Sequence, residues 1–247
     1  MHIESPAKLT LTLTVTGVRA DGYHLIDAEM VSLEIHDIVS VEESDDISLT
    51  IDGPFAAGVP TDATNLVHKA LTRLGRTAKV HITKNIPHGG GLGGGSTNAA
   101  AIFRWADNSD YGSAAQIGAD IPFCIAGGRA RVRGIGEEIE PLPFEARDIT
   151  LIIPPVHVPT PLVYRTWDEL GGPHGDFGND LEPAALAAIP ELATWRDTIE
   201  SAFGQRPHLA GSGATWFVDG HVSPAADTLN GCVVVHTKTR PDAGRVQ

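Results

Sequence analysis

Alternating apolar and polar residues open the chain. Residues 8–16 read KLTLTLTVT, in which Leu or Val occupies every second position and Lys or Thr the others. This period of two is typical of a strand with one buried face. Residues 19–22 read RADG and are predicted to form a turn. Shorter apolar or alternating runs predict further strands at residues 30–35, 37–41, 47–51, 78–82, 128–133, 149–153, 214–218 and 232–236.

Helical spacing first appears at residues 65–74, where the apolar residues fall on one face of a helix. Asp62 and Thr64 precede this segment and are candidates for its N-cap. The same reasoning predicts helices at residues 99–106, 113–117, 181–188 and 192–202.

The predicted strands and helices do not alternate in a βαβ rhythm, which favours an α+β fold. Pro154, Pro155 and the PTP segment at residues 159–161 interrupt the chain after the strand at 149–153. Such prolines are typical of connections, so a domain junction is expected between about residues 145 and 157. We therefore predict an N-terminal domain of residues 1–148 and a C-terminal domain of residues 149–247.

The composition limits the possible partners. The 247 residues carry a formal net charge of −13, so the chain lacks the basic surface that nucleic acids and anionic membranes require. It has no run of eighteen apolar residues and no basic-then-apolar N-terminal signal, and a cytoplasmic location is expected. Cys124 and Cys232 are predicted to be reduced thiols. An acidic protein that binds phosphates must bind them locally, through a specialised loop.

Residues 87–98 read PHGGGLGGGSTN, with six glycines in the seven positions 89–95. Glycine lets a backbone approach a ligand closely, and Ser96, Thr97 or Asn98 is expected to cap a helix that follows. A helix N-terminus binds anions, so a phosphate site is predicted here. A flexible linker is the plainer alternative. A dinucleotide fingerprint also fits residues 89, 91 and 94, but residues 84–88 intervene after the strand and Pro87 would end it.

Five segments resemble, in order and spacing, the motifs of the GHMP kinase family. They are residues 6–11 (PAKLTL), 19–24 (RADGYH), 87–100 (PHGGGLGGGSTNAA), 118–123 (GADIPF) and 211–215 (GSGAT). Within that family, the long glycine-rich loop is similar to the loop of the 4-diphosphocytidyl-2-C-methyl-D-erythritol kinases. The resemblance implies a two-domain GHMP kinase fold, with an N-terminal domain like ribosomal protein S5 and a ferredoxin-like C-terminal domain.

The resemblance implies ATP-dependent phosphorylation of a hydroxyl of 4-diphosphocytidyl-2-C-methyl-D-erythritol, a step of non-mevalonate isoprenoid precursor synthesis, with ATP and Mg²⁺ as cofactors and a small-molecule substrate. Asp120 matches the catalytic aspartate and Lys8 its cationic partner, so the two side chains are predicted to lie close together. From the residues alone, Asp120 is as well explained as a helix cap, and Lys8 as a solvated lysine of an edge strand.

The same resemblance assigns binding residues. Tyr23, His24 and Tyr164 are expected to line one pocket for the cytidine end of the acceptor, although turn and core packing would explain them otherwise. Thr10, Thr160, Gly211 and Ser212 are also placed with the acceptor, and Asn65 and Lys84 near the adenine of ATP. The loop residues expected at the ATP phosphates are Pro87, Gly89, Gly90, Gly91, Leu92, Gly93, Gly94, Gly95, Ser96, Thr97 and Asn98.

Two departures from the family pattern keep rival functions open. Thr10 replaces an asparagine that faces the substrate, and the stretch between the loop and Asp120, residues 99–118, is short. The rivals are a related kinase acting on a sugar, homoserine or a mevalonate-like alcohol, and a non-catalytic nucleotide-binding relative. A dinucleotide oxidoreductase is disfavoured by Pro87. The sequence shows no cluster of metal ligands and leaves the oligomeric state open.

Overall fold

The computed structural model describes residues 1–87, 89–224 and 229–247 and has mixed α+β architecture. Its strands are β1 (His2–Val18), β2 (His24–Glu43), β3 (Ser48–Asp52), β4 (Ala78–Thr83), β5 (Arg129–Gly134), β6 (Glu138–Pro141), β7 (Asp148–Ile153), β8 (His208–Leu209), β9 (Trp216–Asp219) and β10 (Val233–Arg240). Its helices are α1 (Leu66–Leu74), α2 (Gly94–Trp105), α3 (Tyr111–Ala115), α4 (Ile121–Ala126), α5 (Thr160–Glu169), α6 (Glu182–Ala188) and α7 (Glu191–Phe203).

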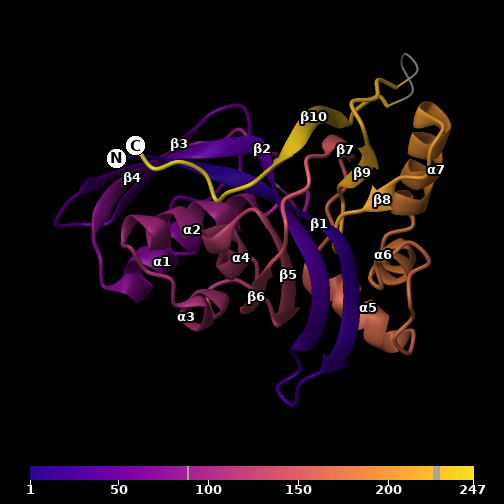
Figure 1. Ribbon diagram of the computed structural model, residues 1–247, viewed down its shortest axis with the longest axis horizontal. Helices are drawn as coiled ribbons and strands as arrows, with labels where there is room; N and C mark the ends of the chain where they lie inside the picture. The colour runs from indigo at the N-terminus through magenta and orange to yellow at the C-terminus, as the bar shows by residue number, and fades with distance from the viewer. Residues whose placement is uncertain (88, 225–228) are drawn as a thin grey trace.

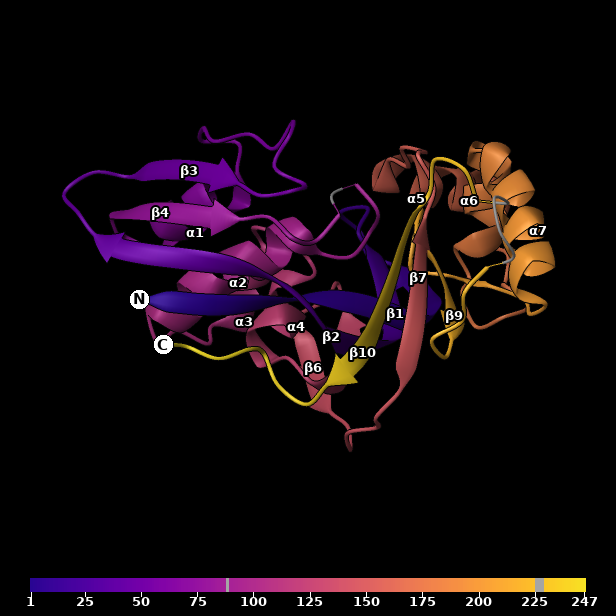
Figure 2. The ribbon, with the colours of Figure 1, turned by 90° about the horizontal axis from the view of Figure 1, so that it is seen from above.

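Two groups of helices pack on different parts of one sheet system (Figure 1). The strands run in the order β3-β4-β2-β10-β7-β9-β8, while β1 pairs with β2, and β5 pairs with β2 and β6. Helices α1 to α4 gather on the N-terminal strands, and α5 to α7 lie beside β7, β8 and β9 (Figures 1 and 2). The three alanines of α2 that begin at Ala99 are fully buried, and their small side chains let this helix pack closely against its neighbours.

Strand β10 links the two groups. Its residues from Val233 to Lys238 pair with β7, whereas Thr239 and Arg240 pair with Leu33 and Ser32 of β2. The C-terminal residues then run along the start of β1, where Ile3 pairs with Val246. Because strands of both halves are joined in this way, the elements that follow β7 are held in a fixed position beside β1 and β2.

The structure confirms most predicted elements and corrects four details. The strands expected at 30–35 and 37–41 are one strand, β2, because its pairing with β1 continues past His36. The cap of α1 is Asn65, whose side chain accepts a hydrogen bond from the Val67 amide, while Asp62 accepts from Thr64 in the preceding turn. The PTP segment at residues 159–161 begins helix α5, because proline fits the first turn of a helix.

The start of α2 is the fourth correction. The helix begins at Gly94 with Gly93 as its N-cap, so Ser96, Thr97 and Asn98 lie inside it and do not cap it. Packing beneath the helix decides this, because the space beside Gly93 and Gly94 is filled by lysine side chains. The unpaired amides of the first turn therefore come from glycines and Ser96.

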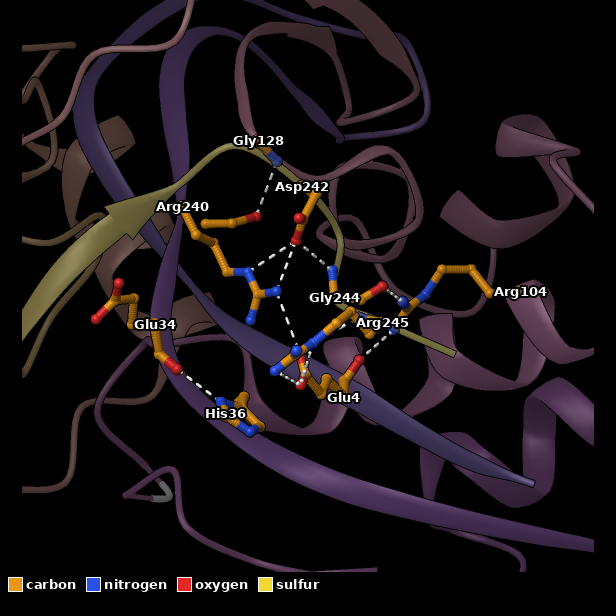
Figure 3. A network of polar contacts seen from close by, with 10 residues as sticks. Glu4, Glu34, His36, Arg104, Gly128, Arg240, Asp242, Gly244 and Arg245 are labelled. Carbon is orange, nitrogen blue, oxygen red and sulfur yellow. Dashed lines mark hydrogen bonds and ion pairs between the residues drawn. The ribbon is translucent and has the colours of Figure 1, made fainter. Parts of the chain in front are cut away.

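Glu4 anchors the C-terminal residues to β1 (Figure 3). Its carboxylate accepts hydrogen bonds from Arg245 Nε (2.9 Å) and Arg240 Nη2 (3.0 Å), and its backbone oxygen accepts from Arg104 of α2 (2.7 Å). Arg104 also donates to the backbone oxygen of Gly244 (3.0 Å). Burial disfavours ionisation of Glu4, but the hydrogen bonds from Arg245 and Arg240 outweigh it and lower its pKa from 4.5 to about 2.

Replacing Glu4 with glutamine is expected to lower the free energy of unfolding by on the order of 2 kcal/mol near neutral pH. Solvent screening reduces the effect, since the Arg245 side chain is 72% exposed. Because the folded pKa lies below the unfolded value of 4.5, the stabilisation is complete above that pH and is lost as the pH falls toward 2. Urea denaturation at about pH 7 and about pH 3 measures this difference.

The matched control is Glu42→Gln, at an exposed position of β2. It should leave stability unchanged at both pH values. A loss in the Glu4 variant that is equally large at both values would mean that the ionised carboxylate is not what stabilises the C-terminal residues.

Candidate active site

Lys8 and Asp120 form an ion pair inside a cleft. Lys8 Nζ lies 3.2 Å from Asp120 Oδ2, and the two side chains are 8% and 32% exposed. Lys8 Nζ also donates to Thr10 Oγ1 at 3.2 Å. Thr10 lies two residues further along β1, on the same face of the strand, and holds the ammonium group in place. The prediction that Lys8 and Asp120 lie close together is confirmed.

Asp120 occupies the N-cap position of α4 but makes no capping hydrogen bond with its side chain. The carboxylate instead faces Lys8, which supplies a positive charge within hydrogen-bond distance. A plain helix cap would use that side chain to satisfy the backbone amides of the first turn. The observed geometry therefore favours the functional reading of Asp120 over the capping one.

The cleft has a volume of about 210 Å³ and is lined by both halves of the chain. Leu13, Ile26, Met30 and Leu181 give it apolar walls, which the sequence analysis did not assign. Such a mixture of apolar walls and a few convergent polar groups is typical of small-molecule sites. The predicted residues that line it are Lys8, Thr10, His24, Gly91, Ser96, Asp120, Thr160, Tyr164, Gly211 and Ser212.

The glycine-rich loop is tied to both walls of the cleft. The backbone oxygen of Leu92 accepts from the Lys8 amide (3.0 Å), and that of Gly90 accepts from the Thr215 amide (3.3 Å). Gly93 has a φ of 69°, and a Cβ atom there would lie 2.6 Å from Lys8 Cγ. Glycine is therefore required at this position, both for backbone conformation and for space.

Helix α2 starts directly at the end of this loop, where Ser96 lines the cleft. Its first amides have no partner within the helix and lie at the positive end of the helix dipole. Gly89 is exposed, Pro87 is buried at the loop entrance, and Gly95 is exposed on the first turn. The predicted arrangement of a glycine loop that opens onto a helix N-terminus is confirmed.

Lys84 lies in a buried network beneath this helix start, and not in the cleft. Its ammonium is 2.5 Å from Asp37 Oδ2 and 3.1 Å from Asn98 Oδ1, and Asn98 Nδ2 donates to the same Asp37 oxygen (2.9 Å). Asp37 Oδ1 accepts from the backbone amides of Asn85 and Ile86. The carboxylate thus has four donors and takes up the charge of Lys84, so this lysine belongs to the buried network, and its place beside adenine stays a prediction.

Asp37 could not be singled out from the sequence, because an acidic residue inside a strand belongs to no motif. The network holds the segment just before the glycine loop to the first turn of α2. Thr97, next to Asn98, is fully buried and also does not reach the cleft surface. The side chains of Asn98 and Thr97 therefore support the loop from the protein interior, and their contact with phosphates stays a prediction.

Asn65 is also committed to a structural contact. Its side chain caps α1 and donates to the backbone oxygen of Pro60 (2.6 Å). With both ends of the amide in use, the expected contact with a nucleotide base is not supported by this side chain. The cause is its place at the start of a helix, where asparagine is a preferred cap.

His24 and Tyr164 meet at the other end of the cleft. Their ring centroids are 4.6 Å apart with an interplanar angle of 33°. Burial raises the pKa of the Tyr164 hydroxyl, and the Asp120 carboxylate raises it further, so this hydroxyl stays protonated. Nearby, Thr160 Oγ1 and Ser212 Oγ are 2.8 Å apart. This contact joins α5 to the GSGAT segment at residues 211–215, which we call the closing motif.

Tyr23 is the exception among the predicted acceptor residues. Its side chain is 58% exposed, and the Arg19 guanidinium lies 5.5 Å from its ring centroid. It follows Gly22 in the turn, and successive side chains at a strand start point in opposite directions. His24 therefore faces the cleft and Tyr23 does not line it, so the prediction of one pocket for all three rings is wrong for Tyr23.

The closing motif is fixed by a residue that the sequence analysis did not single out. Asn179 Nδ2 donates to the backbone oxygens of Leu209 (2.9 Å) and Gly211 (2.7 Å). Asn179 itself pairs with Leu13 of β1 as an isolated bridge. The wall formed by Gly211 and Ser212 is thereby held against the strand that carries Lys8 and Thr10.

Residues 63–128 match the family described as GHMP kinases N terminal domain. A 4-diphosphocytidyl-2-C-methyl-D-erythritol kinase of Paracoccus denitrificans is 38% identical over 86% of this chain and 84% of its own length. One of Ruegeria pomeroyi is 38% identical over 90% and 91%. The chain belongs to the 4-diphosphocytidyl-2-C-methyl-D-erythritol kinase family of GHMP kinases.

Solved structures agree with this membership of the GHMP kinases. A crystal structure of 4-(cytidine 5'-diphospho)-2C-methyl-D-erythritol kinase matches with a TM-score of 0.71 and 27% identity, covering 97% of this chain and all (100%) of that one. A homoserine kinase of Cytophaga hutchinsonii, at 17% identity and a TM-score of 0.58 over 97% and 96%, shows the fold alone. The predicted α+β GHMP kinase fold is confirmed, and the protein is a small-molecule kinase. In the described part of the chain, no helix is long and apolar enough to cross a membrane.

Proposed function

We propose that this kinase transfers the γ-phosphate of ATP to a hydroxyl of 4-diphosphocytidyl-2-C-methyl-D-erythritol. The observation that carries the proposal is the Lys8–Asp120 pair, 3.2 Å apart, between the glycine-rich loop and the His24–Tyr164 end of the cleft. Relatives that carry this name cover most of the chain at 36–38% identity, which supports the choice of acceptor. The two proposed domains, residues 1–148 and 149–247, each contribute one wall.

Asp120 is proposed as the general base. It would take the proton from the acceptor hydroxyl while the hydroxyl oxygen bonds to the γ-phosphorus and the bond to the β-phosphate oxygen breaks. Lys8 would stabilise the negative charge that develops on the transferring group. The free amides of the loop and of the α2 first turn would hold the other phosphates, as expected at a helix N-terminus.

Mg²⁺ is proposed to enter with the ATP phosphates, whose charge it neutralises. Among residues 1–87, 89–224 and 229–247, no group of three or more His, Cys, Asp or Glu is placed to hold a metal ion. This fits an ion carried mainly by phosphate oxygens and water, as is usual for Mg²⁺. Ser96 and Asp120 are two cleft residues whose side-chain oxygen atoms are suited to contact it. Because the reaction draws on ATP, a cytoplasmic location is part of the proposal.

Incubation of the purified chain with ATP, Mg²⁺ and 4-diphosphocytidyl-2-C-methyl-D-erythritol, followed by mass spectrometry, tests this function. The expected product carries one additional phosphoryl group. Homoserine and mevalonate in parallel reactions address the related kinases, and phosphorylation of either in preference to the cytidyl compound would overturn the acceptor. ATP binding without any phosphorylated product would indicate a non-catalytic relative.

Gly93→Val is expected to raise the dissociation constant for ATP by roughly tenfold or more, because it strains a left-handed backbone position. The new side chain would also displace Lys8, whose Cγ lies 2.6 Å from the added Cβ position. Isothermal titration calorimetry measures the affinity, and a melting curve checks that the variant is folded.

Gly95→Ala is the matched control in the same helix turn. An added Cβ there would lie 3.5 Å from Leu66 Cδ1, which is an ordinary contact, and alanine favours a helix. ATP affinity should stay as in the unmodified chain. Unchanged affinity in a folded Gly93→Val protein would place the phosphates elsewhere.

A further inference from the structure

One face of α5 runs from the cleft to the β1–β2 hairpin. Thr160, Tyr164 and Asp168 recur at intervals of four, so they lie on the same side of the helix. Thr160 and Tyr164 line the cleft. Asp168 continues this row, and its Oδ1 lies 2.8 Å from Nε2 of His24, a residue 144 positions earlier. The contact joins the C-terminal half to the hairpin at the end of the cleft opposite the glycine loop.

The contact fixes the hydrogen of the His24 ring. An ionised carboxylate can only accept hydrogen bonds, so Nε2 must be the donor. The Asp168 side chain is 49% exposed, whereas the His24 side chain is only 11% exposed. With the hydrogen on Nε2, a neutral ring has a lone pair on Nδ1. In the part of the chain that the structure describes, no residue forms a hydrogen bond with Nδ1.

Aromatic neighbours fix the plane of the ring. Tyr164 lies against one side of His24, and Trp167 meets it edge-on, with centroids 5.7 Å apart and an angle of 86°. Trp167 is itself anchored, because its Nε1 donates to the backbone oxygen of Pro173 (2.9 Å). The ring therefore has little freedom to turn over, and its protonation pattern is set by Asp168.

We propose that Asp168 is a positioning residue that holds His24 as the Nε2–H tautomer, so that Nδ1 serves as a hydrogen-bond acceptor for the base of the acceptor nucleotide. A cytosine ring offers an exocyclic amino group, which is a donor, whereas uracil has a carbonyl oxygen at the same position. The lone pair on Nδ1 accepts a hydrogen bond from the amino group of cytosine and is repelled by the carbonyl oxygen of uracil. Asp168 thereby sets the preference for a cytidyl over a uridyl compound. This inference rests on the proposed function, because it needs a nucleotide base at this end of the cleft.

Steady-state kinetics of Asp168→Ala and Asp168→Asn test the role. Loss of the carboxylate lets the ring change tautomer, so Asp168→Ala should raise KM for the cytidyl acceptor roughly tenfold. Neither kcat nor KM for ATP should change, because the reacting groups are untouched. Asp168→Asn should restore KM to within about twofold, since its side-chain oxygen still accepts from Nε2. Discrimination against the uridyl analogue should fall in Asp168→Ala by the same factor as KM rises.

Glu169→Ala is the matched control. This neighbour on α5 is 66% exposed and faces Arg165, 3.8 Å away on the helix surface. Its loss should leave all kinetic constants unchanged. A general effect of removing negative charge near the cleft would appear in this variant as well, and an effect of equal size would overturn the specific role of Asp168.

Nitrogen-15 NMR of the histidine-labelled chain gives a readout that does not depend on turnover. The His24 signal, assigned by its loss in His24→Gln, should show a protonated Nε2 and an unprotonated Nδ1 in the unmodified chain and in Asp168→Asn. Two protonated nitrogens at neutral pH would overturn the proposal, because a charged ring has no acceptor. The spectrum also decides the matter if Asp168→Ala fails to fold.

The activity of the unmodified chain distinguishes a failure of the proposed function from a failure of the role of Asp168. If it phosphorylates neither the cytidyl nor the uridyl compound, the proposed function and this inference both fail. If it phosphorylates the cytidyl compound but KM is unchanged in folded Asp168→Ala, only the role of Asp168 is overturned.

Discussion

Asp120→Asn is expected to lower kcat by roughly 10²–10⁴-fold, the usual effect of losing a general base. The carboxylate lies 3.2 Å from the Lys8 ammonium in the cleft and is free of any capping bond, so its replacement takes away a proton acceptor and the counter-charge of Lys8 but no helix cap. The amide has nearly the same shape but cannot take up a proton. Stopped assays with 4-diphosphocytidyl-2-C-methyl-D-erythritol and ATP measure the rate, and calorimetric titration measures ATP binding.

Asp110→Asn makes the same chemical change away from the cleft. Asp110 caps α3 by accepting from the Ser113 amide (2.9 Å), and asparagine caps a helix equally well. This variant should keep full turnover. ATP affinity should be retained in Asp120→Asn, since the phosphate loop is intact. Full turnover in Asp120→Asn would reduce Asp120 to a packing or positioning residue and leave the proton acceptor to be found elsewhere.

Lys84→Met is expected to cause the largest loss of stability, about 3–5 kcal/mol, because it leaves the Asp37 carboxylate buried without a cation. The two side chains are 3% and 0% exposed, so water cannot replace the lost charge. The same change should loosen the start of α2, because the Lys84 side chain packs against Gly94. Its Nζ lies only 2.9 Å from the place that a Cβ atom would occupy at that glycine. Guanidinium denaturation gives the free energy of unfolding, and ATP titration reports on the loop.

The double variant Asp37→Asn with Lys84→Met should be more stable than Lys84→Met alone, since it removes the uncompensated charge. Lys79→Met on the exposed side of β4 is the matched control and should have little effect. If Lys84→Met is as stable as this control, the buried pair contributes nothing to the fold. If the double variant loses more free energy of unfolding than Asp37→Asn and Lys84→Met lose when their separate effects are added, the carboxylate is held by its neutral donors and not by the lysine.

The sequence predicted the strand pattern of the N-terminal half well, since β1 and β4 have one apolar and one polar face that a period of two reveals. Residue patterns alone did not predict that Lys8 and Asp120 would meet. Their 112-residue separation carries no information on distance, and only the family resemblance brought them together. Their 3.2 Å contact depends on how β1 and α4 pack, which is decided by tertiary structure.

Local rules failed where packing decided the outcome. Ser96, Thr97 and Asn98 are good capping residues, yet α2 begins at Gly94, since only glycine fits above the Lys8 and Lys84 side chains. The contacts of Asp37 and Asp168 could not be predicted from the sequence for a related reason. Each is a single acidic residue whose partner is far away in sequence, and neither belongs to a motif of fixed spacing.

Strand β10 has a consequence for how the molecule unfolds. It is paired with β7 up to Lys238 and with β2 from Thr239, so one uninterrupted strand belongs to both halves. Separating the halves would break the pairing of β2 with the last two residues of β10, Thr239 and Arg240, and expose that edge of β2 to water. Loss of structure in either half therefore removes a supporting strand from the other. The two halves, although they form opposite walls of the cleft, are coupled into a single cooperative unit.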